Sequence, residues 1–177
     1  TNKGTQIERI IYAGSINRFG KSRGLESLIN GLRKSNNLEF QIVIASNDNL
    51  SPDLMSLINT KELNIEYHQN LSRTQLAELY KSCTLGLLIN NKSEHAERFT
   101  SPLKYFEYIA SGLKIIASDS KSHKLLPFQE YINYFDSSNT DSFIDAVNNA
   151  INSEQPTYND IQKYTMSHRA LNILNFY

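Results

Sequence analysis

Cysteine, tryptophan, proline and glycine are scarce in this 177-residue chain, which has one Cys, no Trp, four Pro and seven Gly. A single cysteine, Cys83, excludes an internal disulfide framework and a cysteine-based zinc cluster. No apolar run reaches the roughly 18 residues that a transmembrane helix needs. The start of the chain, TNKGTQIERI, also lacks the basic-then-apolar pattern of a signal peptide. We therefore expect a cytoplasmic protein.

An excess charge of either sign is also missing, because 18 Lys and Arg balance 18 Asp and Glu. A general nucleic-acid binder normally has a basic excess, so we expect no nucleic-acid partner. The 40% of hydrophobic and 20% of charged residues are typical of a globular protein. The length fits one domain, residues 1–177. Because the chain does not begin with Met, we expect it to be part of a longer protein.

Apolar and amphipathic segments alternate along the chain. Short apolar, often β-branched runs predict strands at residues 10–13, 40–45, 65–68, 85–89, 114–117 and 133–135. Helical spacing and capping residues predict helices at 25–33, 52–58, 73–82, 102–110, 141–151 and 161–174. This order indicates an α/β fold with a parallel sheet and helices on both faces. Ligands bind such sheets at the carboxyl ends of the strands, near the point where the strand order reverses.

Glycine and basic residues follow the first predicted strand, in the order Gly14, Ser15, Arg18, Lys21, Arg23. A glycine there lets the backbone approach a ligand closely, and three cations in a short loop can neutralise a phosphate or pyrophosphate. The segment matches neither a Walker A motif nor Gly-x-Gly-x-x-Gly. A solvated basic loop is the alternative interpretation.

A second polar segment begins the helix predicted near Ser101. Its free backbone N–H groups should point toward the cleft and suit anionic oxygens. Lys104 and Glu107 are three residues apart and therefore share one face of the helix. A carboxylate on that face could accept hydrogen bonds from both hydroxyls of a ribose. A surface ion pair is the alternative interpretation.

Residues 101–118, SPLKYFEYIASGLKIIAS, resemble the donor-site segment of retaining GT-B glycosyltransferases of family 4. Those enzymes carry a Pro-x-Lys-x-x-Glu-Tyr-x-Ala-x-Gly-x-x-x-Ile-Ala-type stretch. The segment from Tyr12 to Leu25 is similar to the Gly-x-x…Lys-Gly loop of the family, with Arg23 where lysine is usual. Residues 167–176 resemble its closing helix. The resemblance implies a Rossmann-like sheet that forms the C-terminal, donor-binding half of a GT-B fold, with the N-terminal acceptor domain absent.

The resemblance also implies roles for individual residues. Glu107 corresponds to the second Glu of the Glu-x7-Glu motif, which holds the donor ribose, and Arg23, with Arg18 or Lys21, would hold the pyrophosphate. The backbone near the helix start would meet the distal phosphate and the transferred sugar. The implied donor-binding set is Gly14, Ser15, Arg18, Lys21, Arg23, Thr100, Ser101, Pro102, Leu103, Lys104 and Glu107. The first Glu of the motif is replaced by Phe99, and Glu97 is two residues out of register, so sugar positioning stays open.

The implied function is nucleotide-sugar binding in a glycosyltransferase (hexosyltransferase) of polysaccharide biosynthesis. It would move a sugar from a nucleoside-diphosphate sugar to a glycan or lipid-linked acceptor, without a metal or a separate cofactor. No catalytic residue is identified, and we expect the isolated chain to transfer nothing. The family association leaves open a peripheral contact of the full-length enzyme with the inner face of the membrane. The alternatives are a GT-B relative such as a sugar-nucleotide epimerase, and a non-catalytic α/β module such as a phosphoryl receiver.

The histidines and the cysteine have less specific interpretations. His68 either contacts the nucleotide base or is a structural polar residue, and His95 either contacts the sugar or is a solvated loop residue. We expect His123 and His168 at the surface. Cys83 is expected to be a buried structural thiol.

Overall fold

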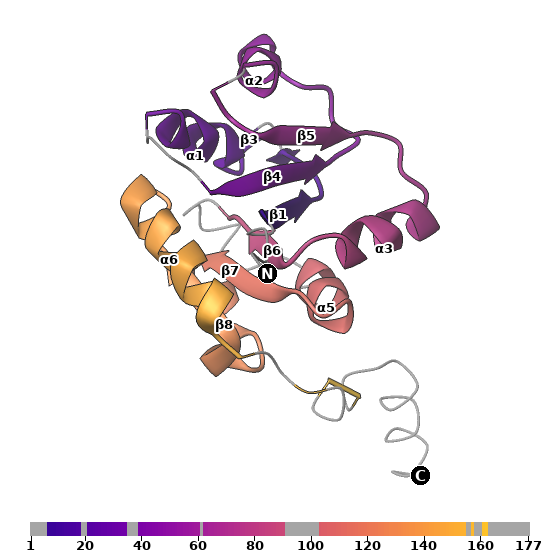
Figure 1. Ribbon diagram of the computed structural model, residues 1–177, viewed down its shortest axis with the longest axis vertical. Helices are drawn as coiled ribbons and strands as arrows, with labels where there is room; N and C mark the ends of the chain where they lie inside the picture. The colour runs from indigo at the N-terminus through magenta and orange to yellow at the C-terminus, as the bar shows by residue number, and fades with distance from the viewer. Residues whose placement is uncertain are drawn as a thin grey trace, which may run out of the picture.

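Six parallel strands form the central sheet of the computed structural model, which describes residues 7–18, 21–34, 39–60, 62–90, 103–154, 157 and 161–162 (Figure 1). The spatial order is β5-β4-β1-β6-β7-β8. These strands span Glu8–Ala13 (β1), Phe40–Ala45 (β4), Ile65–His68 (β5), Leu85–Leu88 (β6), Lys114–Ser118 (β7) and Ile132–Phe135 (β8). A separate antiparallel hairpin, which the sequence did not predict, pairs β2 (Asn17–Arg18) with β3 (Lys21–Ser22).

Five described helices connect the strands, and their ends follow the capping residues in the sequence. They are α1 (Leu25–Leu32), α2 (Pro52–Ile58), α3 (Arg73–Lys81), α5 (Leu103–Ala110) and α6 (Thr140–Asn152). Ser51 caps α2 by accepting a hydrogen bond from Leu54 N. Ser72 and Gln75 form the predicted capping box at the start of α3. Two short 3₁₀ helices, η1 (His123–Leu125) and η2 (Gln129–Tyr131), lie between β7 and β8. Of the helix predicted at 161–174, only residues 161 and 162 are described.

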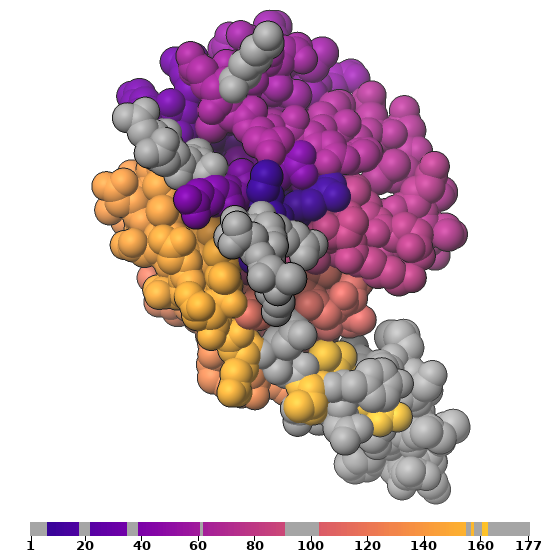
Figure 2. All heavy atoms as spheres, viewed as in Figure 1, coloured from indigo at the N-terminus to yellow at the C-terminus, as the bar shows by residue number. Residues whose placement is uncertain are grey.

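The helices cover both faces of the sheet, as predicted. Ile10 and Tyr12 of β1 pack in one hydrophobic core with α1, α2 and α6. Ile11 and Ala13, which point to the opposite face because strand side chains alternate, pack in a second core with α3 and α5. In the space-filling view, α6 in orange and α3 in pink form opposite flanks of the molecule (Figure 2). Strands covered on both faces explain the nearly continuous apolar runs in the sequence.

The strand order reverses between β1 and β6. From β1 the chain adds β4 and β5 on one side, then returns to place β6, β7 and β8 on the other. The two central strands pair at Ile10–Leu85 and Ile11–Gly86. This places the topological switch point, where ligands bind in such sheets, beside the carboxyl ends of β1 and β6. Within the described ranges, no helix has the length and apolar character to cross a bilayer.

Candidate functional site

Two neighbouring clefts open at the carboxyl ends of the strands. The β6 cleft is lined by Tyr12, Ala13, Arg23, Leu87, Leu88, Ile89, Lys104, Tyr105, Ser122, His123 and Leu126. The β4 cleft is lined by Ala13, Gly14, Ser15, Ala45, Ser46, Asn47, Asp48, His68, Leu71, Leu76 and Lys104. Ala13 and Lys104 line both clefts, so the two adjoin at the switch point. The volume of the β4 cleft is about 200 Å³, somewhat below the roughly 300–1,000 Å³ typical of small-molecule sites.

The loop after β1 forms the shared edge of the clefts. Gly14 has a φ of +139°, in the region that favours glycine, and no atom lies within 4 Å of the position of an added Cβ. The Asp48 carboxylate accepts hydrogen bonds from Ile16 N at 2.7 Å and from Asn17 N at 2.9 Å. Asp48 thereby ties this loop to the end of β4. The sequence analysis did not identify Asp48, whose hydrogen-bond partner Ile16 lies 32 positions away in the sequence.

Arg23 lines the β6 cleft and lies at the end of the loop that the sequence analysis singled out. Its backbone N–H donates to Ile16 O at 3.0 Å, and its guanidinium Nε is buried without a hydrogen-bond partner among the described residues. Burial raises the pKa of the neighbouring Tyr12 hydroxyl to about 12, although the charge of Arg23 opposes this shift. Tyr12 stays neutral and donates to Ser15 O. A half-buried arginine whose Nε donor is unused, beside a cleft, is suited to an anionic oxygen.

Several predicted binding residues are only partly described or not described. Arg18 pairs with Lys21 across the β2–β3 hairpin, but their side chains lie outside the described part of the structure. Thr100, Ser101 and Pro102 lie outside it entirely, as do Glu97, Phe99, His95 and His168. Leu103 begins α5 with a side chain that is 66% exposed.

Glu107 accepts two hydrogen bonds on one carboxylate oxygen, Oε2. Tyr80 Oη donates from 2.8 Å and Lys104 Nζ from 2.7 Å. Lys104 Nζ also lies 3.2 Å from Tyr80 Oη, so the three groups form a closed triangle. Glu107 itself lines neither cleft, and Lys104 connects it to both. Lys104 and Glu107 share one helix face, as predicted, and they form the ion pair that was the alternative interpretation; the contribution of Tyr80 from α3 was missed.

Tyr108, the residue after Glu107, fixes α5 against the end of β1. Its hydroxyl accepts a hydrogen bond from Ala13 N at 2.8 Å, beyond the point where β1 pairs with β6. Its ring meets that of Tyr80 edge to face, with centroids 5.4 Å apart. Burial raises the pKa of the Tyr108 hydroxyl well above its usual value of 10, so it stays neutral. Gly86 leaves room for this ring beneath α5.

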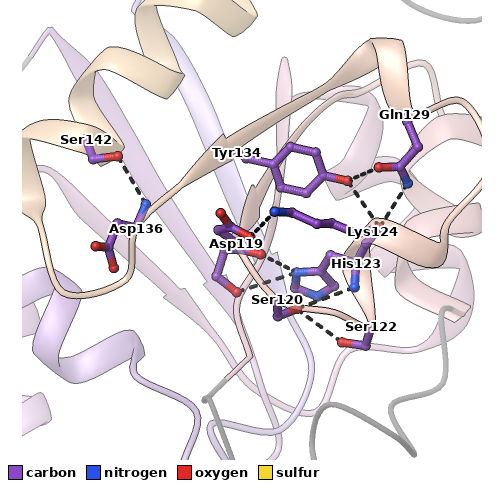
Figure 3. Close-up of polar contacts among 10 residues, drawn as sticks. Asp119, Ser120, Ser122, His123, Lys124, Gln129, Tyr134, Asp136 and Ser142 are labelled. Atoms are coloured by element: carbon purple, nitrogen blue, oxygen red, sulfur yellow. Dashed lines mark hydrogen bonds and ion pairs between the residues drawn. The ribbon is translucent and has the colours of Figure 1, made fainter.

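His123 is buried, so the prediction that it lies at the surface is wrong. The chain turns after β7 into η1, where His123 lies among Ser120, Ser122 and Gln129 (Figure 3). His123 is also part of the lining of the β6 cleft. Nδ1 lies 2.8 Å from Ser118 O and must carry the proton, because a carbonyl only accepts. Gln129 Nε2 donates to the His123 carbonyl at 3.1 Å, and the Tyr134 hydroxyl donates to Gln129 Oε1 at 2.6 Å. Burial, with a smaller effect of the Arg23 charge, lowers the pKa of His123 below 6.5.

His68 lines the β4 cleft, with its Nε2 2.5 Å from Glu66 Oε1. The contact with Glu66 fits the structural interpretation of His68. The position of His68 in the lining of the β4 cleft also fits a contact with the nucleotide base. Cys83 is buried, as predicted, and burial raises its thiol pKa. Among the described residues, no group of three or more His, Cys, Asp and Glu side chains could hold a metal ion.

Comparison with known proteins points in the same direction as the geometry. The model of a family described as "Glycosyl transferase-like" matches residues 23–175. A search of curated protein sequences returned no match.

Three solved structures share the fold. The glycosyltransferase GlyE of Streptococcus pneumoniae TIGR4 has a TM-score of 0.56 and 16% identity, over 83% of this chain and 34% of GlyE. The catalytic domain of the cholesterol-alpha-glucosyltransferase of Helicobacter pylori has the same score and identity, over 97% of this chain and 100% of that one. The UDP-GlcNAc 2-epimerase of Methanocaldococcus jannaschii has a TM-score of 0.60 and 12% identity, over 97% and 46%. The chain thus spans about a third of GlyE and about half of the epimerase.

Proposed function

The chain belongs to the glycosyl transferase-like family, and from this premise we propose that it is the donor-binding domain of a glycosyltransferase. It would hold a nucleoside-diphosphate sugar across the two clefts at the switch point. In a complete GT-B enzyme a second domain would bind a glycan or lipid-linked acceptor on the other side of the donor. We further propose that the enzyme belongs to the retaining family 4, which the 101–118 segment resembles, and that it works in the cytoplasm.

The observation that carries this proposal is the convergence of unlike polar groups at one edge of the sheet. Arg23 and Lys104 supply fixed positive charge in the β6 cleft. The Gly14 backbone lies next to the β4 cleft, where it can approach a ligand without a side chain. A carboxylate, Glu107, lies 2.7 Å from Lys104. A diphosphate needs cations and N–H donors, whereas a ribose needs an acceptor for its hydroxyls, so this combination suits a nucleoside diphosphate.

These residues also suit the chemistry of transfer. When the bond between the sugar and the diphosphate breaks, negative charge grows on the leaving diphosphate. Arg23 and Lys104 are held in place before that event, so they stabilise the charge without costly reorganisation. The donor itself supplies the leaving group, and we propose no resident cofactor. The residue that activates the acceptor would come from the other domain.

A sugar-nucleotide epimerase is the second candidate, because Phe99 stands where the first Glu of the family motif is expected. That substitution removes a carboxylate from the region assigned to the sugar while leaving the diphosphate and ribose groups in place. A phosphoryl-receiver module is disfavoured, since it needs carboxylates at the ends of β1 and β6. This chain has Ala13, Gly14 and Asn90 there.

Titration calorimetry of the 177-residue chain with UDP, GDP and their sugar conjugates tests the proposal. We expect weak but saturable binding of at least one nucleoside diphosphate and weaker binding of the matching monophosphate, which lacks one phosphate group. The proposal would be contradicted if none of these nucleotides bound at about millimolar concentration. A dissociation constant of that size corresponds to a binding free energy of about −4 kcal/mol. Assaying the full-length protein for sugar transfer against epimerisation separates the two candidates.

A further inference from the structure

We propose that Tyr80 and Lys104 are positioning residues that orient the Glu107 carboxylate, so that Oε1 is presented to the ribose of the donor. This inference rests on the proposed function. The two oxygens of the Glu107 carboxylate have different hydrogen-bond partners. Oε2 accepts from Tyr80 Oη at 2.8 Å and from Lys104 Nζ at 2.7 Å, whereas no hydrogen bond from a described residue engages Oε1.

The triangle lies next to the β4 cleft. Leu76 of α3 and Lys104 of α5 both line that cleft. Tyr80 is four residues after Leu76, and Glu107 is three residues after Lys104, so each lies on the same helix face as a cleft-lining residue. The two helices therefore bring Tyr80 and Glu107 together one turn beyond the cleft lining. A ligand group at the α3–α5 end of the cleft would meet Glu107 there.

Tyr80 and Lys104, the two donors to Glu107 Oε2, have different roles. Tyr80 has a single hydroxyl proton, and because Lys104 can only donate, that proton goes to Glu107. Burial, together with the nearby Tyr108 and Glu107, raises the pKa of Tyr80 well above 10, so the proton stays on the hydroxyl. Lys104 Nζ donates to Tyr80 Oη and to Glu107 Oε2. A ribose hydroxyl can then donate only to Oε1 without displacing an existing bond.

Tyr80 is held in place by the residues packed around it, whereas the side chain of Glu107 is 43% exposed and depends on its hydrogen bonds for a fixed position. Tyr80 is 4% exposed and packs edge to face on Tyr108, which is itself bonded to the end of β1. These contacts therefore fix the position of Glu107 Oε2 relative to β1, a central strand of the sheet. A half-exposed Glu without these two bonds would sample several rotamers and would lose that freedom when the ribose binds.

The test compares nucleotides with and without ribose hydroxyls. UDP, GDP, their 2′,3′-dideoxy forms and inorganic pyrophosphate are titrated calorimetrically into the wild-type chain, Tyr80→Phe, Lys104→Met, Glu107→Gln and the Tyr80→Phe/Glu107→Gln double variant. Tyr80→Phe keeps the ring on Tyr108 and removes only the hydroxyl. Tyr131→Phe, on η2 and outside both cleft linings, is the matched control for loss of a hydroxyl. Lys81→Met, which breaks the similarly spaced Glu78–Lys81 pair on α3, is the control for Lys104→Met.

We expect the wild type to prefer ribose over dideoxyribose by about tenfold or more, as two hydrogen bonds to a carboxylate would give. Tyr80→Phe should reduce that preference at least about threefold while leaving pyrophosphate affinity unchanged. Glu107→Gln should reduce it further, and the double variant should resemble Glu107→Gln. Lys104→Met should also reduce the preference for ribose over dideoxyribose. This variant therefore tests the positioning role if Tyr80→Phe does not fold. Both control variants should match the wild type.

The outcomes separate this inference from the proposed function. If the wild type binds no nucleotide, the proposed function fails, and the inference fails with it. If the wild type prefers ribose and either folded variant, Tyr80→Phe or Lys104→Met, keeps the full preference, only the positioning role is overturned. Equal loss of affinity for pyrophosphate and nucleotide in Tyr80→Phe would also overturn it, because that pattern indicates general damage to the site.

Discussion

Gly86 of β6 and Tyr108 of α5 pack so closely that a Cβ atom on Gly86 would lie 2.4 Å from Tyr108 Cδ2. The Tyr108 ring is fully buried, and its hydroxyl is held by Ala13 N, so it has no free space into which to move. The missing side chain at Gly86 therefore determines how closely α5 approaches the sheet. Through Tyr108, it also determines where Lys104 and Glu107 lie relative to the end of β1.

Gly86→Ala is expected to lower the free energy of unfolding by about 1–3 kcal/mol, the usual cost of overpacking a core. Chemical denaturation measures this loss. Tyr108→Leu should cost less stability in the Gly86→Ala background than in the wild type, because the smaller side chain makes room for the methyl group. The coupling between the two positions should then be favourable. Strictly additive effects of the two substitutions would show that the contact does not limit the position of α5.

Asp48→Ala should loosen the loop after β1, since it removes the acceptor of the Ile16 and Asn17 N–H groups. We expect a loss of about 1–3 kcal/mol in stability together with weaker binding of a nucleoside diphosphate, because Gly14 and Ser15 lose their anchor. Denaturation and calorimetry measure the two effects. Asp145→Ala, at an exposed position on α6, is the control and should change neither. A folded Asp48→Ala chain with wild-type affinity would argue against a role of this loop.

Arg23→Ala should weaken binding of a nucleoside diphosphate by about tenfold or more, as expected for a lost charge-assisted bond to phosphate. Titration calorimetry measures the effect. Arg33→Ala is the matched control, because Arg33 caps the other end of α1 and, within the described part of the chain, its side chain makes a single long, exposed ion pair, with Glu62. Equal affinities of the Arg23→Ala and Arg33→Ala variants would remove Arg23 from the site.

His123 should make the stability of the chain depend on pH in the acidic range. Its folded pKa lies below 6.5, so below that pH the unfolded state binds the proton more readily and the free energy of unfolding falls. Between about pH 7.5 and pH 5.5, the wild type should lose more stability than His123→Gln, by up to about 1.4 kcal/mol per unit of pKa depression. Denaturation at several pH values measures the difference. Parallel curves below pH 6.5 would contradict the prediction.

Local features of the fold were predictable from the sequence, whereas contacts between distant segments were not. The bounds predicted for β4, β5 and α2 match the structure, because apolar runs and the Ser51-Pro52 cap act within a few residues. The β2–β3 hairpin was missed, since it consists of two residues per strand with no apolar pattern.

The residues of the candidate site also fall into those that the local sequence predicted and those that only tertiary contacts reveal. Gly14, Arg23 and Lys104 were located by their places after a strand or at a helix start, and the structure puts all three at the clefts. Tyr80, Asp48 and His123 act through tertiary packing. Tyr80 reaches a residue 27 positions away and Asp48 one 32 positions away, and no spacing rule connects such pairs. His123 is buried by the turn into η1, which a polar sequence such as Ser120-Lys121-Ser122 does not predict.

The most direct test of the central claim is a crystal of this chain soaked with UDP and GDP. The account predicts density for the diphosphate beside Arg23 and Lys104, next to the Gly14 backbone, with the ribose within hydrogen-bonding distance of Glu107 Oε1. Density for a nucleotide elsewhere on the surface, with the two clefts at the ends of β1 and β6 unoccupied, would contradict it.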